Sequence, residues 1–151
     1  MRLCAADTPV GRLLIAEEAE RIVRIDVTEE PLPPPETALQ RACAAQLAEY
    51  FAGERRVFDL PVEARGTAFQ QAVWRALADI PWGETRTYGE IAAAVGRPSA
   101  CRAVGGAIHR NPLLIVTPCH RVVGKNGLTG FRAGVDMKRR LLLLEGLCVQ
   151  E

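Results

Sequence analysis

The sequence lacks a long apolar run, a paired cysteine motif and a histidine cluster, and each absence excludes a class of protein. No stretch approaches the roughly 18 to 20 apolar residues that span a bilayer, and no signal-peptide core follows Met1. The five cysteines show no C-x-x-C spacing, which favours reduced thiols over a disulfide framework. With two histidines and no H-x-x-x-H pattern, a zinc site is not expected. We therefore expect a cytoplasmic protein with no membrane span and no metal.

Size and charge allow one ordinary domain or two small ones. The 151 residues, 48% of them hydrophobic, are enough to bury a core. Residues 1–65 carry 8 Lys/Arg against 12 Asp/Glu, whereas residues 66–140 carry 11 against 4. A basic second part suits an anionic polymer such as nucleic acid, although solvated arginines on a small domain are also common.

The first third predicts a small antiparallel sheet followed by one helix. Strands are expected at residues 2–5, 13–16 and 22–27. Period-two alternation in the last of these places Val23, Ile25 and Val27 on the apolar face. After a proline-rich connector, Thr37 begins a helix with a capping box that ends at Gly53. Nothing in this part carries chemistry, so residues 1–60 are predicted to form a supporting α/β domain.

Residues 61–151 are predicted to form a second, mainly helical domain. Capping boxes predict helix starts at Thr67 and Thr87. Trp74, on the first of these helices, is more consistent with a core residue than with a platform for a ligand. A hairpin is expected where Val122-Val123 and Leu128-Thr129 flank a glycine-bounded turn.

A helix from Pro98 to His109 follows the Thr87 helix and a tight glycine turn, which makes a helix-turn-helix pattern. Gly105 and Gly106 each destabilise a helix by about 1 kcal/mol relative to alanine. A helix with so little side-chain bulk indicates close approach, either of another helix or of an external surface. Arg102, a long cation among small residues, favours a nucleic-acid groove.

The last helix is expected to begin at Val135 or Asp136. Its core-facing residues would be Met137, Leu141 and Leu144. Glu145 lies in its last turn, where the helix macrodipole disfavours a negative charge. We therefore expect Glu145 to have a partner.

Cys119 lies between Pro118 and His120, at the end of an apolar run. Pro118 lacks an N–H and fixes its own φ, so pairing should stop there and the thiol should be exposed on a turn. Most free cysteines are instead small buried hydrophobes. To act as a nucleophile, a thiol with an ordinary pKa near 8.5 needs a base or a positive field, and His120 and Arg121 are the local candidates.

Three blocks of sequence together resemble the O6-alkylguanine-DNA alkyltransferase family. They are Pro118-Cys119-His120-Arg121-Val122, Arg102-Ala103-Val104-Gly105-Gly106-Ala107 and Leu143-Leu144-Glu145-Gly146. The likeness runs through residues 67–146 and is weaker in the first third. It implies an α+β fold, with a small N-terminal α/β subdomain and a mainly helical C-terminal domain containing a winged-helix-like helix-turn-helix.

The resemblance implies a chemical role for five residues. Cys119 would accept the alkyl group from guanine O6, and His120, held by Glu145, would take the thiol proton. Asn111 would brace the active-site turn. Tyr88 would donate a proton to guanine N3, although on the sequence alone it is more typical of a core aromatic.

The resemblance also implies how DNA is bound. The helix carrying Arg102 would lie in the minor groove, and Arg102 would fill the space left by a flipped nucleotide. The DNA- and base-binding residues would be Arg102, Ala103, Gly105, Tyr88, Val122, Phe131 and Arg132. One monomer would repair one O6-alkylguanine or O4-alkylthymine in double-stranded DNA, irreversibly and with no cofactor. Phe131 stands where many members have tyrosine, so the range of alkyl groups stays open.

Three other interpretations compete with alkyl transfer. A non-catalytic protein that binds alkyl lesions and flags damage is one, but relatives of that kind lack the cysteine. A transcriptional regulator would leave the Cys-His-Glu set unexplained, and the helix offers few long side chains to contact bases. A cysteine hydrolase would have no use for the small-residue helix.

Overall fold

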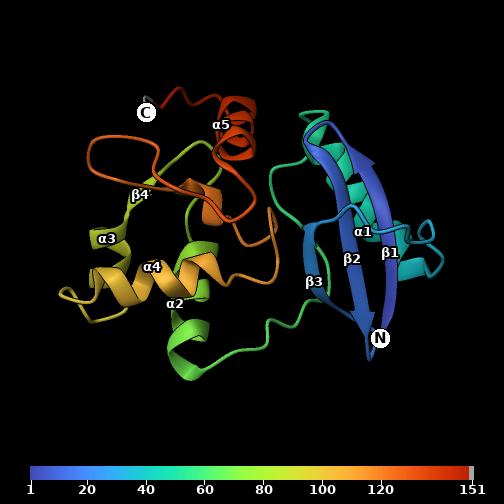
Figure 1. Cartoon of the computed structure of the whole chain (residues 1–151), viewed down its shortest axis with the longest axis horizontal. Helices are drawn as coiled ribbons and strands as arrows, with labels where there is room; N and C mark the ends of the chain where they lie inside the picture. Colours follow the sequence, from blue (N-terminus) through green and yellow to red (C-terminus); the bar gives the residue numbers. More distant parts are fainter. Residues whose placement is uncertain (150–151) are drawn as a thin grey trace. The chain divides into compact units, whose positions relative to one another are not determined.

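The computed structural model describes residues 1–149 and divides into two compact units (Figure 1). Unit 1 comprises Met1–Arg65 with Pro112–Leu114, and unit 2 comprises Gly66–Asn111 and the chain from Ile115 onward. Unit 1 is a sheet with one helix and unit 2 is mainly helical, so the predicted α+β class is confirmed. No helix in residues 1–149 is both long enough and apolar enough to cross a membrane.

Unit 1 contains the predicted antiparallel meander, with longer strands than expected. The strands are β1 (Arg2–Thr8), β2 (Gly11–Glu18) and β3 (Arg21–Val27), in the order β1-β2-β3. Pairing extends to the turns because Thr8 pairs with Gly11 and Glu18 with Arg21. Helix α1 (Ala38–Phe51) has the expected capping box at Thr37 and packs on β1 and β2.

The prediction for the inward face of β3 is confirmed at Val23 and Ile25, which are buried, and wrong at Val27. Ala16 pairs with Arg24 and Glu17 pairs with Ile22, so Val23 is the extra residue of a β-bulge. The bulge breaks the period-two alternation: Ile22 and Ile25 are both fully buried, whereas Val27, expected to face inward, is 41% exposed.

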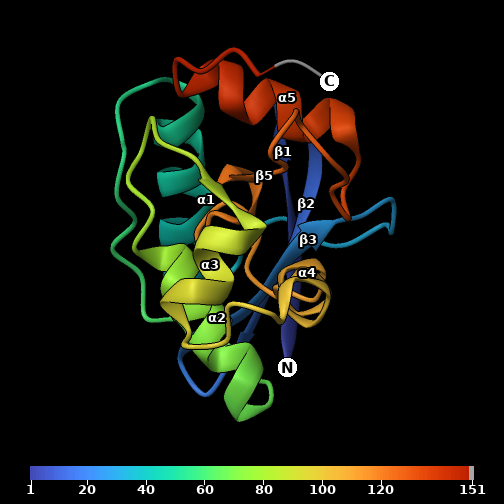
Figure 2. The ribbon, with the colours of Figure 1, turned by 90° about the vertical axis from the view of Figure 1, so that its left-hand side faces the viewer.

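Unit 2 is built on helices α2 (Ala68–Ala78), α3 (Tyr88–Ala94) and α4 (Cys101–His109), which pack on one another (Figure 2). The capping boxes of α2 and α3 are present as predicted. Helix α4 begins at Cys101 and not at Pro98, because Pro98 lies in a turn closed by a hydrogen bond from the Ala100 N–H to the Arg97 carbonyl.

Trp74 is a core residue of unit 2, as predicted. It is buried, and its indole N–H donates to the carbonyl of Ala107 in α4 at 2.9 Å. This bond satisfies the only polar atom of the ring and fixes α2 against α4.

The predicted hairpin after the cysteine is wrong. Strand β5 (Val122–Val123) pairs in parallel with β4 (Arg86–Thr87), and only an isolated bridge joins Gly124 to Gly127. Thr129 has a φ of 59°, in the left-handed region, so the chain cannot run on as a second hairpin strand there.

Helix α5 (Val135–Leu144) buries Met137 and Leu141, as expected. Leu144, expected in the core, is only half-buried, and Lys138 lies in the core instead. The lysine occupies the apolar face because it stands three and four residues before two buried leucines, Leu141 and Leu142.

Candidate active site

Cys119 begins a single 3₁₀ turn, η1 (Cys119–Arg121), directly after Pro118. The expectation that the thiol is exposed is wrong, since Cys119 is only 4% exposed. The turn is closed by a hydrogen bond from the Arg121 N–H to the Pro118 carbonyl at 3.0 Å. A buried thiol gains reactivity only if neighbouring groups help it to ionise.

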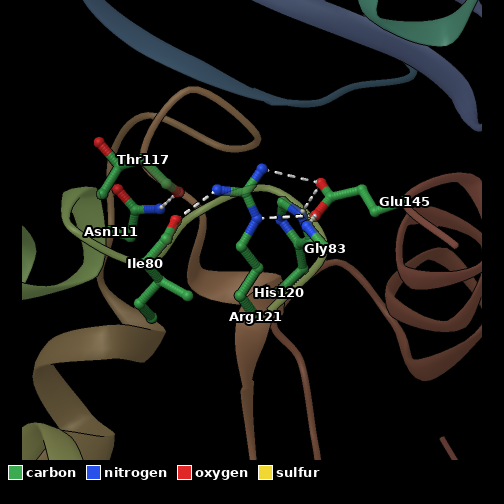
Figure 3. A network of polar contacts seen from close by, with 7 residues as sticks. All are labelled: Ile80, Gly83, Asn111, Thr117, His120, Arg121 and Glu145. Atoms are coloured by element: carbon green, nitrogen blue, oxygen red, sulfur yellow. Dashed lines mark hydrogen bonds and ion pairs between the residues drawn. The ribbon is translucent and has the colours of Figure 1, made fainter. Parts of the chain in front are cut away.

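Asn111 fixes the chain just before the cysteine. Its side-chain amide donates to the Thr117 carbonyl at 2.9 Å (Figure 3). Asn111 is almost fully buried. Asn111 also hydrogen-bonds the thiol, which opposes the rise in the Cys119 pKa that burial causes. The structure thus places Asn111 beside Cys119.

Glu145 holds two neighbours of the cysteine at once. His120 Nε2 lies 2.7 Å from Glu145 Oε2, and both side chains are fully buried. Arg121 donates from Nε to Oε1 at 2.7 Å and from Nη2 to Oε2 at 3.1 Å. Figure 3 shows the Arg121 guanidinium between this carboxylate and the carbonyl of Ile80, which accepts a third bond at 2.6 Å. The acid at the end of α5 therefore has the partner expected of it.

The hydrogen bond to Glu145 determines the tautomer of His120. A carboxylate only accepts hydrogen bonds, so Nε2 carries the proton and a neutral ring keeps its lone pair on Nδ1. Burial lowers the pKa of His120, against the opposing effect of Glu145, and the charges of Arg121 and Lys138 lower it further. Nδ1 is buried and has no hydrogen-bond partner among residues 1–149. The ring is thus neutral at neutral pH and has one basic nitrogen available.

The positive field at the thiol does not come from Arg121, as the sequence suggested. Arg121 is engaged with Glu145, and the two cations that lower the Cys119 pKa are Arg132 and Lys138. Lys138 was missed by the sequence analysis, although a lysine on the apolar stripe of a helix is a signal that could have identified it. Burial lowers the pKa of Lys138 to about 8, and the charge of a Cys119 thiolate raises it.

Tyr88, the first residue of α3, is half-buried. Its hydroxyl lies 3.1 Å from the hydroxyl of Thr129. A Cβ added at Gly105 would lie 3.9 Å from the Tyr88 ring, so the glycine backbone of α4 borders the tyrosine.

Helix α4 presents Arg102 and Ala103 on its exposed face. Gly106 lies next to open space, because a Cβ built there would meet nothing within 4 Å. Packing inside the protein therefore does not require glycine at this position. Of the two explanations for a helix with so little bulk, this favours approach by an external surface.

The remaining predicted site residues are spread over two segments. Val122 is fully buried in β5, while Phe131 and Arg132 are half-buried in the loop before α5. Arg132 donates to the carbonyls of His109 at 2.8 Å and Asn111 at 2.7 Å, so it ties this loop to the end of α4. Within residues 1–149 no three His, Cys, Asp or Glu side chains are grouped so as to hold a metal ion.

Two family models match this chain. The DNA binding domain of 6-O-methylguanine DNA methyltransferase matches residues 68–147, and the ribonuclease-like domain of the same family matches residues 1–64.

Curated relatives and a solved structure agree with these matches. A Methanosarcina acetivorans methylated-DNA–protein-cysteine methyltransferase is 47% identical over 150 residues, covering 94% of this chain and 96% of the relative. The constitutive Bacillus subtilis protein of that name is 47% identical over 158 aligned positions, covering 97% and 96%. A Mycobacterium tuberculosis OGT solved in complex with DNA aligns with a TM-score of 0.88 and 44% identity, covering 96% of this chain and 92% of that one.

Proposed function

The chain belongs to the 6-O-methylguanine DNA methyltransferase family, and we propose that Cys119 is the residue that accepts the alkyl group. The protein repairs DNA by alkyl transfer, as its relatives' names indicate. The observation that carries the assignment of Cys119 is the buried His120–Glu145 pair next to it in the chain, together with a basic Nδ1 of His120 that has no hydrogen-bond partner within residues 1–149. We further propose that residues 61–151 form the alkyltransferase domain and residues 1–60 support it.

Proton removal from Cys119 is the first step. Nδ1 of His120 takes the thiol proton, directly or across one water, and the Glu145 carboxylate stabilises the imidazolium that forms. Because burial raises the thiol pKa and lowers the His120 pKa, the resting pair is neutral, and charge develops only when the base acts. Asn111, Arg132 and Lys138 then stabilise the thiolate.

Transfer is an in-line displacement at the alkyl carbon. A bond forms between Cys119 Sγ and that carbon while the carbon–O6 bond breaks, and the electron pair stays on the guanine. Tyr88 gives its phenolic proton to guanine N3, which makes the base a better leaving group. A thioether does not leave again under these conditions, so one chain repairs one lesion and no cofactor takes part.

DNA is the partner, and we propose that α4 enters the minor groove of a duplex. The M. tuberculosis relative was solved with DNA, and the open surface at Gly106 and the exposed Arg102 fit such an approach. The guanine lies inside the stack, so the nucleotide must flip out, and Arg102 fills the gap. Val122, Phe131 and Arg132 then border the base. We propose a monomer acting in the cytoplasm, where its cysteines stay reduced.

Mass spectrometry tests this function directly. The full chain is mixed with duplex DNA carrying one O6-methylguanine, and the mass of the protein and its peptides is measured. We expect one added methyl group per chain, on the Cys119 peptide, absent from Cys119→Ala and present in the matched variant Cys101→Ala. Preferential binding of the lesion with no gain in mass would overturn alkyl transfer and favour a protein that only flags damage.

A further inference from the structure

The hydroxyl of Thr129 joins two groups of the active site. Lys138 Nζ lies 3.2 Å from Thr129 Oγ1, and the Tyr88 hydroxyl lies 3.1 Å from the same atom. These contacts bring the first residue of α3, the loop before α5 and α5 itself to one oxygen atom.

The donors and acceptors at Thr129 can be assigned. Its single hydroxyl proton is donated to the Leu128 carbonyl, 2.6 Å away. Both lone pairs are therefore available to accept, one from the Lys138 ammonium and one from the Tyr88 phenol. In the resting protein the phenolic proton of Tyr88 thus points to Thr129, and the hydroxyl of Thr129 makes three hydrogen bonds.

Lys138 is buried, contacts Thr129 and interacts electrostatically with the proposed nucleophile. Its side chain is 1% exposed, and its other hydrogen bond goes to the Gly130 carbonyl at 3.3 Å. The charge of Lys138 lowers the pKa of two titratable groups of η1, Cys119 and His120. The charge of Arg132, in the loop before α5, also lowers the pKa of Cys119. The pKa of His120 is raised by Glu145 and lowered by Arg121.

Thr129 has a backbone conformation that a β-branched residue rarely adopts. It is exposed, and its φ of 59° lies in the left-handed region, where glycine or asparagine meets less steric resistance. Gly124 makes room for its methyl group, because a Cβ at position 124 would come within 2.4 Å of Thr129 Cγ2. Burial does not account for a threonine here, whereas its hydroxyl has three partners.

We propose that Thr129 is a positioning residue for alkyl transfer, which holds the Lys138 ammonium beside the Cys119 thiolate and the Tyr88 phenol ready for the flipped base. This role rests on the proposed function of Cys119 and Tyr88. One hydroxyl thereby aligns the group that stabilises the nucleophile with the group that protonates the leaving base. Loss of the hydroxyl leaves both groups in place but free to adopt other rotamers.

The test separates ionisation of the thiol from the transfer reaction. Ionisation of Cys119 is followed without DNA by the ultraviolet absorbance of the thiolate. The absorbance of the same variant carrying Cys119→Ala is subtracted at each pH. Transfer is measured separately, as a single-turnover rate on duplex DNA with O6-methylguanine. The variants are Thr129→Val, which keeps the branched shape, Thr129→Ser, which keeps the hydroxyl, and Lys138→Met, with the exposed Lys125→Met as its matched control.

We expect Lys138→Met to raise the Cys119 pKa by about one unit, the size typical of losing a nearby charge. Thr129→Val should raise this pKa by less and slow transfer about tenfold, which is less than the roughly hundredfold or more that loss of a general acid itself costs, because Tyr88 is still present. Thr129→Ser should recover most of the rate, and Lys125→Met should change neither quantity.

Two results would overturn the proposal. One is a thiol titration and transfer rate of Thr129→Val equal to those of the wild type. The other is an equal loss in Thr129→Ser and Thr129→Val, since that would implicate the methyl group. If the wild-type chain transfers no methyl group, the proposed function fails, and the thiol titration still decides whether Thr129 positions the cation.

Discussion

His120 Nε2 lies 2.7 Å from Glu145 Oε2, and the same carboxylate binds the guanidinium of Arg121 through both oxygens. One buried anion therefore orients the proposed base and neutralises a buried cation. The chemistry of the site and the stability of unit 2 depend on the same side chain.

Replacing that anion should affect stability and activity together. Glu145→Gln keeps the shape but leaves the Arg121 cation buried without its counter-charge, which is expected to destabilise the fold by about 3 to 5 kcal/mol. The amide can also donate to Nε2, which favours the wrong His120 tautomer, so transfer should slow by roughly a hundredfold. Urea unfolding and single-turnover rates measure the two effects.

Asp136→Asn is the matched control for Glu145→Gln. It removes a carboxylate from α5 whose side chain is 94% exposed and which pairs with Arg139 at 2.9 Å. An exposed ion pair and an exposed carboxylate in the first turn of a helix each contribute little, so the unfolding free energy of this variant should stay within about 1 kcal/mol of wild type. Equal losses in the two variants would show that helix charge, and not the buried network, sets the stability.

The stability of the protein should fall as the pH drops below the ordinary His pKa. Burial lowers the pKa of His120 from 6.5, so between that value and its lower native pKa the unfolded chain binds more protons than the native one. The stabilisation is therefore complete above pH 6.5 and is lost as the pH decreases. Urea unfolding at a series of pH values should show a smaller loss in His120→Gln than in wild type.

His109→Gln provides the comparison, because His109 is the other histidine and lies exposed at the end of α4. The unfolding free energy of the His109→Gln variant should change with pH as that of the wild type does. A loss of stability below pH 6.5 that persists unchanged in His120→Gln would mean that other groups cause it.

Local sequence signals predicted the elements of this fold that depend on neighbouring residues. The helices beginning after Thr37, Thr67 and Thr87 were found because a capping box involves residues only three apart. The bulge at Val23 and the parallel pairing of Val122 with Arg86 were missed. Both depend on a partner strand that the local pattern does not specify.

The features of the candidate site that depend on neighbouring residues were likewise predicted, and those that depend on tertiary packing were not. The partner of Glu145 was anticipated because an acid at a helix C-terminus conflicts with the dipole. That the thiol is buried, and that Lys138 lies beside it, depends on how η1 and the loop before α5 fold together. Arg121 was expected to act on the cysteine because it is close in sequence, but its guanidinium is directed to Glu145.

Arg102 should matter for duplex DNA and not for a free base. Arg102→Ala is expected to slow transfer from O6-methylguanine in duplex DNA about tenfold, because the flipped state loses the side chain that fills the gap. Reaction with the free O6-alkylguanine base needs no flipping, so its rate should stay at the wild-type value. Both rates are obtained from single-turnover assays.

Arg75→Ala controls for charge, since Arg75 is an exposed arginine of α2. Any loss of non-specific DNA affinity from removing one cation should be similar in the two variants. An equal slowing of transfer in Arg75→Ala and Arg102→Ala would contradict a specific role for Arg102 in flipping.

Lys138→Met should make the protein more stable at neutral pH. Burial lowers the pKa of Lys138 from 10.5 to about 8, so the native state binds fewer protons than the unfolded state between these values, and at pH 7 the buried charge opposes folding. A tenfold difference in proton affinity between the native and unfolded states corresponds to about 1.4 kcal/mol of stability. The hydrogen bonds of Lys138 to Thr129 and Gly130 offset part of the free-energy cost of burying its charge. We expect a net gain of about 1 to 2 kcal/mol in urea unfolding at pH 7, and a smaller gain as the pH rises to 10.5.

Lys125→Met, the same substitution at an exposed lysine, should leave the unfolding free energy unchanged. A loss of stability in Lys138→Met would show that the lysine is retained for packing and its hydrogen bonds. A gain in stability together with a raised Cys119 pKa would show that Lys138 opposes folding and favours the thiolate. Such a residue is explained by its part in the reaction and not by a contribution to stability.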